Sequence, residues 1–284
     1  MQKIALMTPV KDEMDNLEAF FKAVSSQSRP IDRLIIIEND SVDGSKEYLE
    51  TLSSVDNVVN LQILHMSFAD KSYDLGFKYS RIIGHGLEAL KQAEDYESYD
   101  FVGILDSDCF PEPEYLEKIV SFMEEDPQIG IASGWVFTHE GKRQIADPNF
   151  VRGNSRLWRR ECLEQTGFPI EPSPDAITVA LAHIHGWKTK TLPTARVTAR
   201  EVNTRMQNYS NQGKRVYYRG HSLLYAFIRA SYTAIFKGMP KLGLDFFSGY
   251  LGDFFRNRPK IKDLKVRKYY RYYLLRKRLY SAAR

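Results

Sequence analysis

Two carboxylates stand two residues apart after an apolar run. Asp106 and Asp108 flank Ser107 directly after Phe101–Leu105, which has the composition of a buried strand. Side chains two positions apart in an extended segment point the same way, so the two carboxylates would repel unless a cation offset the cost. A small set of hard oxygen ligands suits Mg²⁺ or Mn²⁺ bound jointly with substrate phosphates. The alternative is a polar turn that closes the strand.

Asp175 is a further acidic candidate. It follows Pro169, Pro172 and Pro174 and opens a segment that we expect to be helical as far as about His185. A carboxylate held in this way can take a proton from an attacking hydroxyl as a general base. The alternative is an ordinary carboxylate at a helix N-terminus.

Polar residues also follow a second apolar run. Leu34–Ile37 is a nearly continuous β-branched stretch, typical of a parallel strand covered on both faces, and residues 38–45 are mostly polar. These side chains can read a nucleobase edge or ribose hydroxyls. Alternatively, they form a loop in which Ser41 or Asp43 caps the next helix.

The elements that would position these groups alternate over the first 140 residues. Short apolar runs predict strands, and apolar residues at helical spacing predict helices between them. We expect strands at Lys3–Thr8, Leu34–Ile37, Val58–His65, Phe101–Leu105 and Ile129–Phe137, and helices at Leu17–Val24, Lys46–Leu52, Phe77–Ala93 and Pro113–Met123. This order indicates an α/β fold with a doubly wound, mostly parallel sheet, in which ligands bind at the carboxyl ends of the strands.

The pattern changes after about residue 150. Residues 152–167 predict a loop that leads into a short helix, and the chain is expected to be helical, aromatic and basic after Pro193. We therefore expect an α/β domain over residues 1–200 and a helical, basic and aromatic C-terminal extension over residues 201–284.

Charge is distributed unevenly along the chain. The net charge is +4, but residues 256–284 carry twelve Lys and Arg residues and one acid, Asp263, while the rest of the chain is at −7. Val266, Tyr269, Tyr270, Tyr273 and Tyr280 form an approximate helical stripe among these bases. Such a helix is typical of a peripheral contact with an anionic membrane. Alternatively, the stripe packs on the α/β domain; nucleic-acid binding is disfavoured because no recognised module accompanies it.

Composition excludes several classes of protein. With 43% apolar and 27% charged residues, the chain is not disordered. Two cysteines, Cys109 and Cys162, are too few for a disulfide scaffold or a four-ligand zinc site and favour a reducing compartment. No secretory signal is visible, and the longest apolar stretch, Leu223–Phe236, falls short of the roughly 18–20 residues of a membrane span. We therefore expect a cytoplasmic protein, peripheral on the inner face of the membrane.

Six segments, in order between residues 3 and 193, resemble the motifs of the family 2 inverting nucleotide-sugar glycosyltransferases. They are Thr8–Glu13, Ile36–Ser45, Arg81 with Gly84 or Gly86, Leu105–Asp108, Gly153–Glu161, and Pro174–Asp175 followed by Gly186–Lys188. The resemblance implies a GT-A fold, a metal at Asp106 and Asp108, and Asp175 as the catalytic base. It also implies contacts to the nucleotide sugar from Thr8, Pro9, Glu38, Asn39, Arg81, Asp106 and Ser107.

The sequence departs from the family pattern at three places. Asp12 stands where Asn is usual, and Glu38 stands where Asp is common. No His follows Pro193 where many relatives have one that completes the metal site; Thr198–Glu201 stands there instead. Arg200 or a later basic residue would then act on the leaving diphosphate.

A later segment resembles part of a related motif. Gln212–Val216 is similar to the Gln-x-x-Arg-Trp segment of processive polysaccharide synthases, with Val216 in place of Trp. The resemblance makes Arg215, with Arg219, a candidate contact for the diphosphate or the acceptor; a solvated helix face is the alternative. Because those synthases carry membrane spans, we interpret this chain as a single-addition enzyme.

The resulting hypothesis is a metal-dependent inverting glycosyltransferase. Its partners would be a nucleotide-sugar donor, with a mild preference for UDP, and a saccharide or lipid-linked acceptor. One alternative is a nucleotidyltransferase, which we would expect to carry a glycine-rich phosphate loop near the N-terminus; Thr8–Glu13 has no glycine. The other is a non-catalytic nucleotide- or glycan-binding protein of the same fold.

Overall fold

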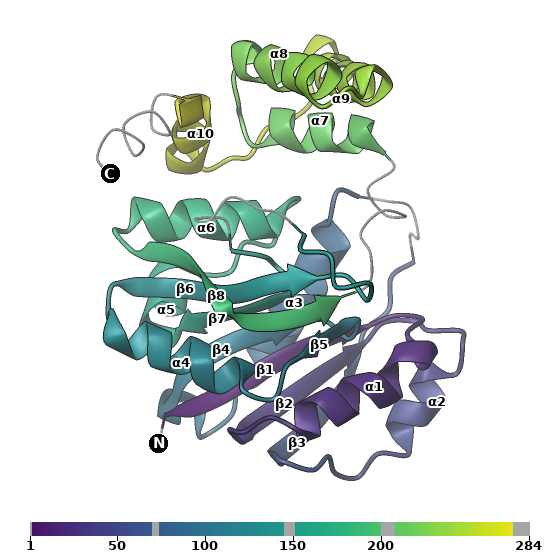
Figure 1. Cartoon of the computed structure of the whole chain (residues 1–284), viewed down its shortest axis with the longest axis vertical. Coiled ribbons are helices and arrows are strands. Elements are labelled where there is room, and N and C mark those ends of the chain that lie inside the picture. The colour runs from purple at the N-terminus through teal and green to yellow at the C-terminus, as the bar shows by residue number, and fades with distance from the viewer. Residues whose placement is uncertain (1, 70–73, 145–150, 200–207, 275–284) are drawn as a thin grey trace.

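The computed structural model describes residues 2–69, 74–144, 151–199 and 208–274 of the 284-residue chain (Figure 1). The described residues contain an eight-stranded sheet with the order β3-β2-β1-β4-β7-β6-β8-β5. The strands are β1 (Lys3–Val10), β2 (Ile31–Glu38), β3 (Val58–His65), β4 (Tyr99–Leu105), β5 (Cys109–Pro111), β6 (Ile129–Phe137), β7 (Ser155–Arg159) and β8 (Lys188–Ala199).

The first four strands in this order run parallel. β1 lies between β2 and β4, and β2 pairs in turn with β3. Helices cover both faces of this part of the sheet, which explains why Leu34–Ile37 is apolar at every position. Leu34 and Ile36 belong to one buried cluster, whereas Ile35 and Ile37 belong to the cluster on the other face.

Six helices of the described chain form the two covering layers: α1 (Met14–Ser25), α2 (Ser45–Glu50), α3 (Phe77–Lys91), α4 (Tyr115–Glu125), α5 (Arg160–Thr166) and α6 (Pro174–Ile184). A short 3₁₀ helix, η1 (Tyr96–Ser98), precedes β4. The apolar residues of α1, α2 and α4 fill one cluster, and those of α3, α5 and α6 fill the other. The doubly wound α/β fold expected from the sequence is confirmed.

Two local expectations are wrong. The first half of residues 152–167 contains a strand, β7, which runs antiparallel between β4 and β6. β8 also continues through Pro193 to Ala199, where helix was expected. Proline is accommodated because the pairing of β6 with β8 jumps from Leu192 to Arg196, so the intervening residues form a bulge that needs no ladder hydrogen bond.

The C-terminal part is helical and lies over one end of the α/β body (Figure 1). It contains α7 (Tyr209–Tyr218), α8 (Leu223–Ser231), the π-helical turn η3 (Tyr232–Phe236), α9 (Pro240–Phe255) and α10 (Leu264–Arg271). We refer to residues 208–274 as the helical unit. α7 and α9 pack closely because Gly213 and Gly249 lie at their contact. A Cβ at either position would collide with the backbone of the facing helix.

The basic tail packs its aromatic stripe on the body. Val266 and Tyr270 of α10 are buried against Ala176 and its neighbours on α6. The Tyr270 hydroxyl donates to the Ala176 carbonyl, and Tyr269 Oη lies 2.6 Å from Nδ1 of His183. Tyr280 lies outside the described residues. The packing alternative thus accounts for the described part of the stripe. No helix in the described part of the chain is long and apolar enough to span a bilayer.

Candidate active site

The predicted polar groups gather at the carboxyl edge of the parallel strands. Val10 and Glu38, the last residues of β1 and β2, are in register, and the Asn39 N–H donates to the Val10 carbonyl at 3.0 Å. Asp106 follows β4, the neighbour of β1 on its other side. This edge is where open α/β sheets bind ligands.

Glu38, Asn39 and Thr8 differ in what they contact. The Glu38 carboxylate is buried; it accepts from the Ser41 N–H at 2.6 Å and lies 3.1 Å from Nδ1 of His65, so it holds its own loop in place. Asn39 Oδ1 and Thr8 Oγ1 are buried and have no hydrogen-bond partner among the described residues. Because a buried polar atom without a partner is costly, these two atoms are candidates for contact with a polar ligand.

The Asp106–Asp108 segment is anchored at three points. The Asp106 N–H donates to the Asn154 carbonyl at 2.8 Å, and Asp106 Oδ1 accepts from the Tyr79 hydroxyl at 2.9 Å. Ser107 Oγ donates to the Pro9 carbonyl at 3.0 Å, which ties the segment to the end of β1. The segment is therefore held by hydrogen bonds on both sides, as a preformed ligand site requires.

Cys109 is not a nucleophile in this arrangement. Burial raises the pKa of its thiol well above the ordinary value, and the nearby carboxylates of Asp106 and Asp108 raise it further. The thiol therefore stays protonated at neutral pH, and the thiolate is the reactive form.

Tyr79 is a site residue that the sequence did not reveal. It lies in the first turn of α3, where no motif marks it. Burial raises the pKa of its phenol well above the usual value, and the charges of Asp106 and Asp175 raise it further. Tyr79 is therefore a hydrogen-bond donor close to both carboxylates.

Asp175 lies in the first turn of α6, directly after the Pro174 that starts the helix. Its Oδ1 lies 3.3 Å from Nη2 of Arg156, whose side chain is fully buried, while the Asp175 side chain is 43% exposed. Arg156 is itself held by the Arg152 carbonyl, which accepts from Nε at 2.7 Å. One end of the carboxylate is thus fixed, and the other remains accessible to a substrate.

Gly153 joins Asp175 to Asp106. A Cβ at Gly153 would overlap all three atoms of the Asp175 carboxyl group, so the carboxylate rests directly on the Gly153 Cα. The next residue, Asn154, accepts the backbone hydrogen bond from Asp106. The dipeptide Gly153–Asn154 therefore separates the candidate base, Asp175, from the candidate metal ligand Asp106. At this separation both carboxylates can act on one phosphate-linked substrate.

The remaining predicted residues lie at different distances from this centre. Arg81 is exposed on α3, and its guanidinium stacks 4.9 Å from the centre of the Phe68 ring. Arg215 lies on α7 in the helical unit. Its neighbour Arg219 reaches the site more directly, since its Nη1 donates at 2.8 Å to Oγ of Ser173, the residue that precedes α6.

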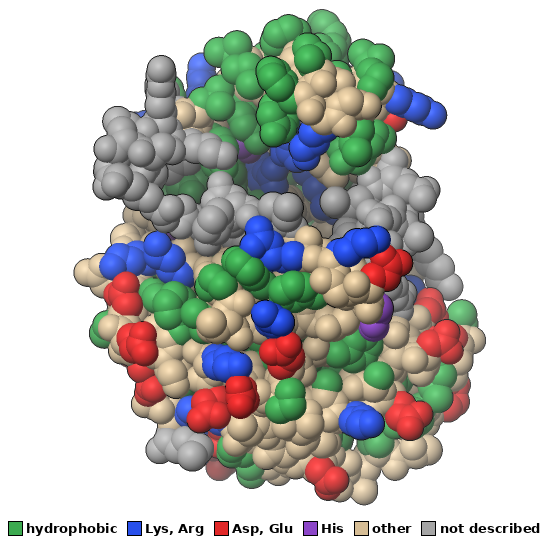
Figure 2. All heavy atoms as spheres, in the orientation of Figure 1, with side chains coloured by type: hydrophobic (Ala, Val, Ile, Leu, Met, Phe, Trp, Pro, Cys, Tyr) green, Lys and Arg blue, Asp and Glu red, His purple; other side chains and the backbone are tan. Residues whose placement is uncertain are grey.

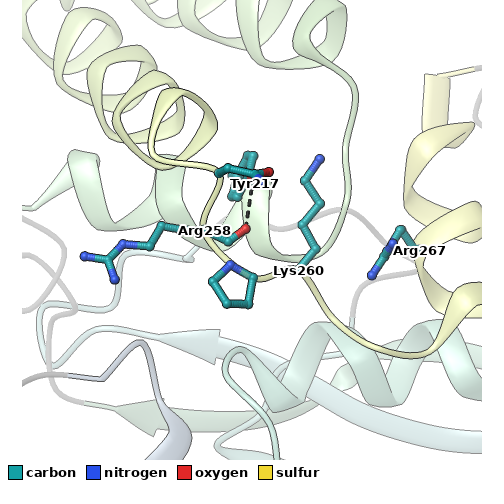
Figure 3. A pocket seen from close by; sticks show the side chains of 6 residues that line it. Tyr217, Arg258, Lys260 and Arg267 are labelled. Carbon is teal, nitrogen blue, oxygen red and sulfur yellow. Dashed lines mark hydrogen bonds between the residues drawn. The ribbon is translucent and has the colours of Figure 1, made fainter.

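A pocket of about 390 Å³ lies in the helical unit between α7, the segment that follows α9, and α10 (Figure 3). It is lined by Tyr217, Asn257, Arg258, Pro259, Lys260 and Arg267. The Lys260 ammonium lies 4.5 Å from the centre of the Tyr217 ring. Burial lowers the pKa of Lys260, and the neighbouring charges of Arg267 and Arg271 lower it further.

Asp106 and Asp108 have the chemistry of a divalent-cation site. Both are half-buried carboxylates on a segment held by hydrogen bonds. Within the described ranges, no group of three or more His, Cys, Asp or Glu side chains converges to hold a metal. Two carboxylates alone fit Mg²⁺ or Mn²⁺ completed by substrate phosphates and water. β8 ends at Ala199, which is paired with Cys109, and Arg200, the residue predicted to act on the leaving diphosphate, lies outside the described residues.

Comparison with known proteins identifies a family. The profile described as Glycosyl transferase family 2 matches residues 6–178, which is more than half of the chain. A probable glucomannan 4-beta-mannosyltransferase 3 of Oryza sativa subsp. japonica is 24% identical over 241 residues, covering 75% of this chain and 42% of that protein. Glycosyltransferase AglE of Haloferax volcanii is 28% identical over 120 residues, covering 42% of this chain and 34% of that protein. The chain therefore spans less than half the length of these curated relatives.

Solved structures share the fold. TarS 1–349 of S. aureus superposes with a TM-score of 0.54 at 14% identity, covering 90% of this chain and 73% of that one. The mannosyltransferase PcManGT from Pyrobaculum calidifontis, solved with GDP-Man and Mn²⁺, superposes with a TM-score of 0.53 at 15% identity. That match covers 99% of this chain and 81% of PcManGT. At these identities the likeness supports the fold alone.

Proposed function

Because the chain belongs to glycosyl transferase family 2, we propose that this glycosyltransferase moves a hexosyl group, with inversion, from a nucleotide-activated donor to a hydroxyl of a saccharide or lipid-linked acceptor. The observation that carries this proposal is the placement of the Asp175 carboxylate on Gly153, one residue from the Asn154 carbonyl that holds Asp106. A base and a diphosphate site are then close enough to act on one donor.

The nucleoside binds at the ends of β1 and β2. Asn39 Oδ1 and Thr8 Oγ1, the buried atoms without partners in the described chain, contact its base or ribose. Pro9 and Ser107, which are joined by a hydrogen bond, lie beneath the nucleoside, and the exposed Arg81 lies at the margin of the nucleoside site. TarS has been solved with UDP and with UDP-GlcNAc, and PcManGT with GDP-Man, which supports a nucleotide sugar as the donor and leaves both bases to be tested.

Asp106 and Asp108 would hold Mg²⁺ or Mn²⁺ with the donor diphosphate, and the ion would supply Lewis-acid stabilisation of the leaving group's charge. Tyr79 orients the site through its hydrogen bond to Asp106 Oδ1. Arg219 brings positive charge to the start of α6, and Arg215 lies one turn earlier on α7.

Asp175 is the general base of the transfer. As the acceptor oxygen bonds to the anomeric carbon, the hydroxyl proton passes to Asp175. The bond from that carbon to the diphosphate oxygen breaks, and its electron pair leaves with the nucleoside diphosphate. Attack from the face opposite the leaving group inverts the anomeric centre. The pair with Arg156 keeps the carboxylate oriented through this step.

The test replaces Asp175 by Asn. We expect transfer to fall by about 10²–10⁴-fold because the amide takes no proton, while nucleotide affinity changes little. Asp15→Asn, in the first turn of α1, is the matched control and should leave transfer unchanged. Full transfer by Asp175→Asn would refute the role of this residue.

Nucleotide binding tests the requirement for a metal and the identity of the donor's nucleobase. Thermal shifts with UDP and GDP, each with and without Mn²⁺, should show stabilisation that requires the metal. Asp108→Asn should abolish the metal-dependent part. Stabilisation by both nucleotides without metal, unchanged in Asp108→Asn, would contradict the metal assignment and favour a non-catalytic nucleotide-binding protein.

A further inference from the structure

The helical unit exposes an apolar face. From Leu223 to Phe236 the chain runs through α8 and η3, and six of its large apolar side chains are 44–78% exposed. They are Leu224, Phe227, Ile228, Tyr232, Ile235 and Phe236. Their spacing of three and four residues places them along one side of the helix, and we refer to them as the α8 face. Figure 2 shows apolar side chains gathered at this end of the molecule, over the helical unit.

The usual arrangement of a surface helix is reversed in α8. Its buried residues are the small Ala226 and Ala230. They allow α8 and α9 to approach so closely that a Cβ at Gly243 would lie 2.6 Å from the Ala230 carbonyl oxygen. The large apolar residues point away from the body, whereas a helix of a protein in water normally buries them. Arg229, the one charge within α8, turns inward and donates to Gln212 Oε1 at 3.1 Å.

The charge of the helical unit identifies the kind of surface that covers this face. Residues 208–274 contain fourteen Lys and Arg residues and three acids, Asp245, Asp253 and Asp263, which gives +11. Lys237 directly follows the α8 face, and the exposed Lys241 lies in the first turn of α9, whereas three of the other bases line the pocket between α7 and α10 in Figure 3. A second copy of this unit would bring two such charges together, whereas an anionic surface attracts them.

We propose that the α8 face docks on a membrane that contains anionic lipid. An amphipathic segment with large aliphatic and aromatic residues and nearby bases lies in the plane of the interface, with its apolar side in the acyl region and its bases at the headgroups. At fourteen residues, Leu223–Phe236 is shorter than the roughly 20 that span a bilayer. The docking surface is therefore α8 and η3, and the aromatic stripe of α10 is occupied by its packing on α6.

The test uses the full chain and lipid vesicles. Co-sedimentation with phosphatidylcholine vesicles containing about 30% phosphatidylglycerol should show binding that weakens in high salt and without the anionic lipid, because exposed charges are screened beyond about 8 Å at physiological ionic strength. Ile235→Ser with Phe236→Ser should lower the partition coefficient at least tenfold. Val59→Ser, which removes an exposed apolar side chain from β3, is the matched control and should bind as the parent does.

A direct readout of insertion separates docking from weak charge attraction. A tryptophan at position 236 (Phe236→Trp) should be quenched by brominated lipid, while Val59→Trp should not be. Equal binding by the parent and the double serine variant would overturn the proposal. Failure of the parent to bind the anionic vesicles would also overturn it, and a dimer in light scattering that the double variant converts to a monomer would then assign the α8 face to a second copy.

Discussion

Gly153→Ala tests whether catalysis depends on where the Asp175 carboxylate rests. The new methyl group would occupy the position of that carboxylate, which must move by about 1 Å to restore a normal contact. A shift of that size is enough to cost about 10²-fold in rate when it misplaces a reacting group. It would also loosen the 3.3 Å pair with Arg156. Nucleotide affinity should be nearly unchanged, because the contacts proposed for the nucleoside, Thr8 and Asn39, lie on β1 and directly after β2, whereas Gly153 lies in the bend before β7.

The stability cost of Gly153→Ala is expected to be modest. Adding one methyl group to a packed site costs about 1–3 kcal/mol, and here the obstructing group is a side chain that is 43% exposed and can move outward. Gly252→Ala is the matched control: its new Cβ would come no nearer than 3.6 Å to the Arg256 guanidinium, so it should be neutral or stabilising.

A double-mutant cycle completes the assay. Initial transfer rates are measured for Gly153→Ala, Asp175→Asn and the two combined, with folding checked by thermal denaturation. If the glycine acts through Asp175, the double variant should be no slower than Asp175→Asn alone. Additive losses would refute this reasoning, and so would full activity in Gly153→Ala.

Three further predictions concern contacts outside this pair. Tyr79→Phe removes the 2.9 Å hydrogen bond to Asp106, so metal-dependent nucleotide affinity, measured by calorimetry, should fall about 10–100-fold. The hydrogen bond from the Tyr99 hydroxyl lowers the pKa of Asp95 below its ordinary value of 3.8. The ionised carboxylate therefore stabilises the fold above about pH 4, and this contribution is lost on acidification. Asp95→Asn should flatten the acid side of the profile of unfolding free energy against pH, and an unchanged profile would contradict this. Val266→Ala should lower the unfolding free energy by about 1–2 kcal/mol in calorimetry without weakening vesicle binding, whereas the reverse outcome would restore the tail as the membrane contact.

Most of the α/β body could be predicted from the sequence because its signals are local. The run Leu34–Ile37 and the alternation of elements indicated a sheet covered on both faces, and the predicted bounds of β3 and β6 agree with the structure. β7 was missed because a five-residue strand with polar ends, Ser155 to Arg159, carries little periodic signal. Pro193 was misleading because a bulge removes the hydrogen bond that proline cannot make.

The candidate site was predictable where it follows strand ends. Asp106, Asp108 and Asn39 were predicted as site residues because a polar residue after a buried strand marks the ligand edge of a parallel sheet, and the structure places all three after strand ends. Glu38 was grouped with them on the same reasoning. The structure adds contacts of its carboxylate with Ser41 and His65, which depend on loops that the local pattern does not describe, and its contact with a nucleotide stays a prediction.

The proximity of Tyr79 and Asp175 could not be predicted, because it depends on a contact between the segments that precede α3 and α6. Leu75 precedes α3 and Ser173 precedes α6, and both have left-handed backbone conformations (φ of 61° and 64°), which are unusual for residues with a Cβ. The Ser173 N–H donates to the Leu75 carbonyl at 3.1 Å, so the two strained positions hold each other. Such conformations cost about 1–3 kcal/mol each and persist only where the surrounding structure fixes them. This contact brings the first turns of α3 and α6 together, with Tyr79 on one and Asp175 on the other. Because the two residues lie 96 positions apart, their interaction follows from the assembled fold, and no local spacing in the sequence indicates it.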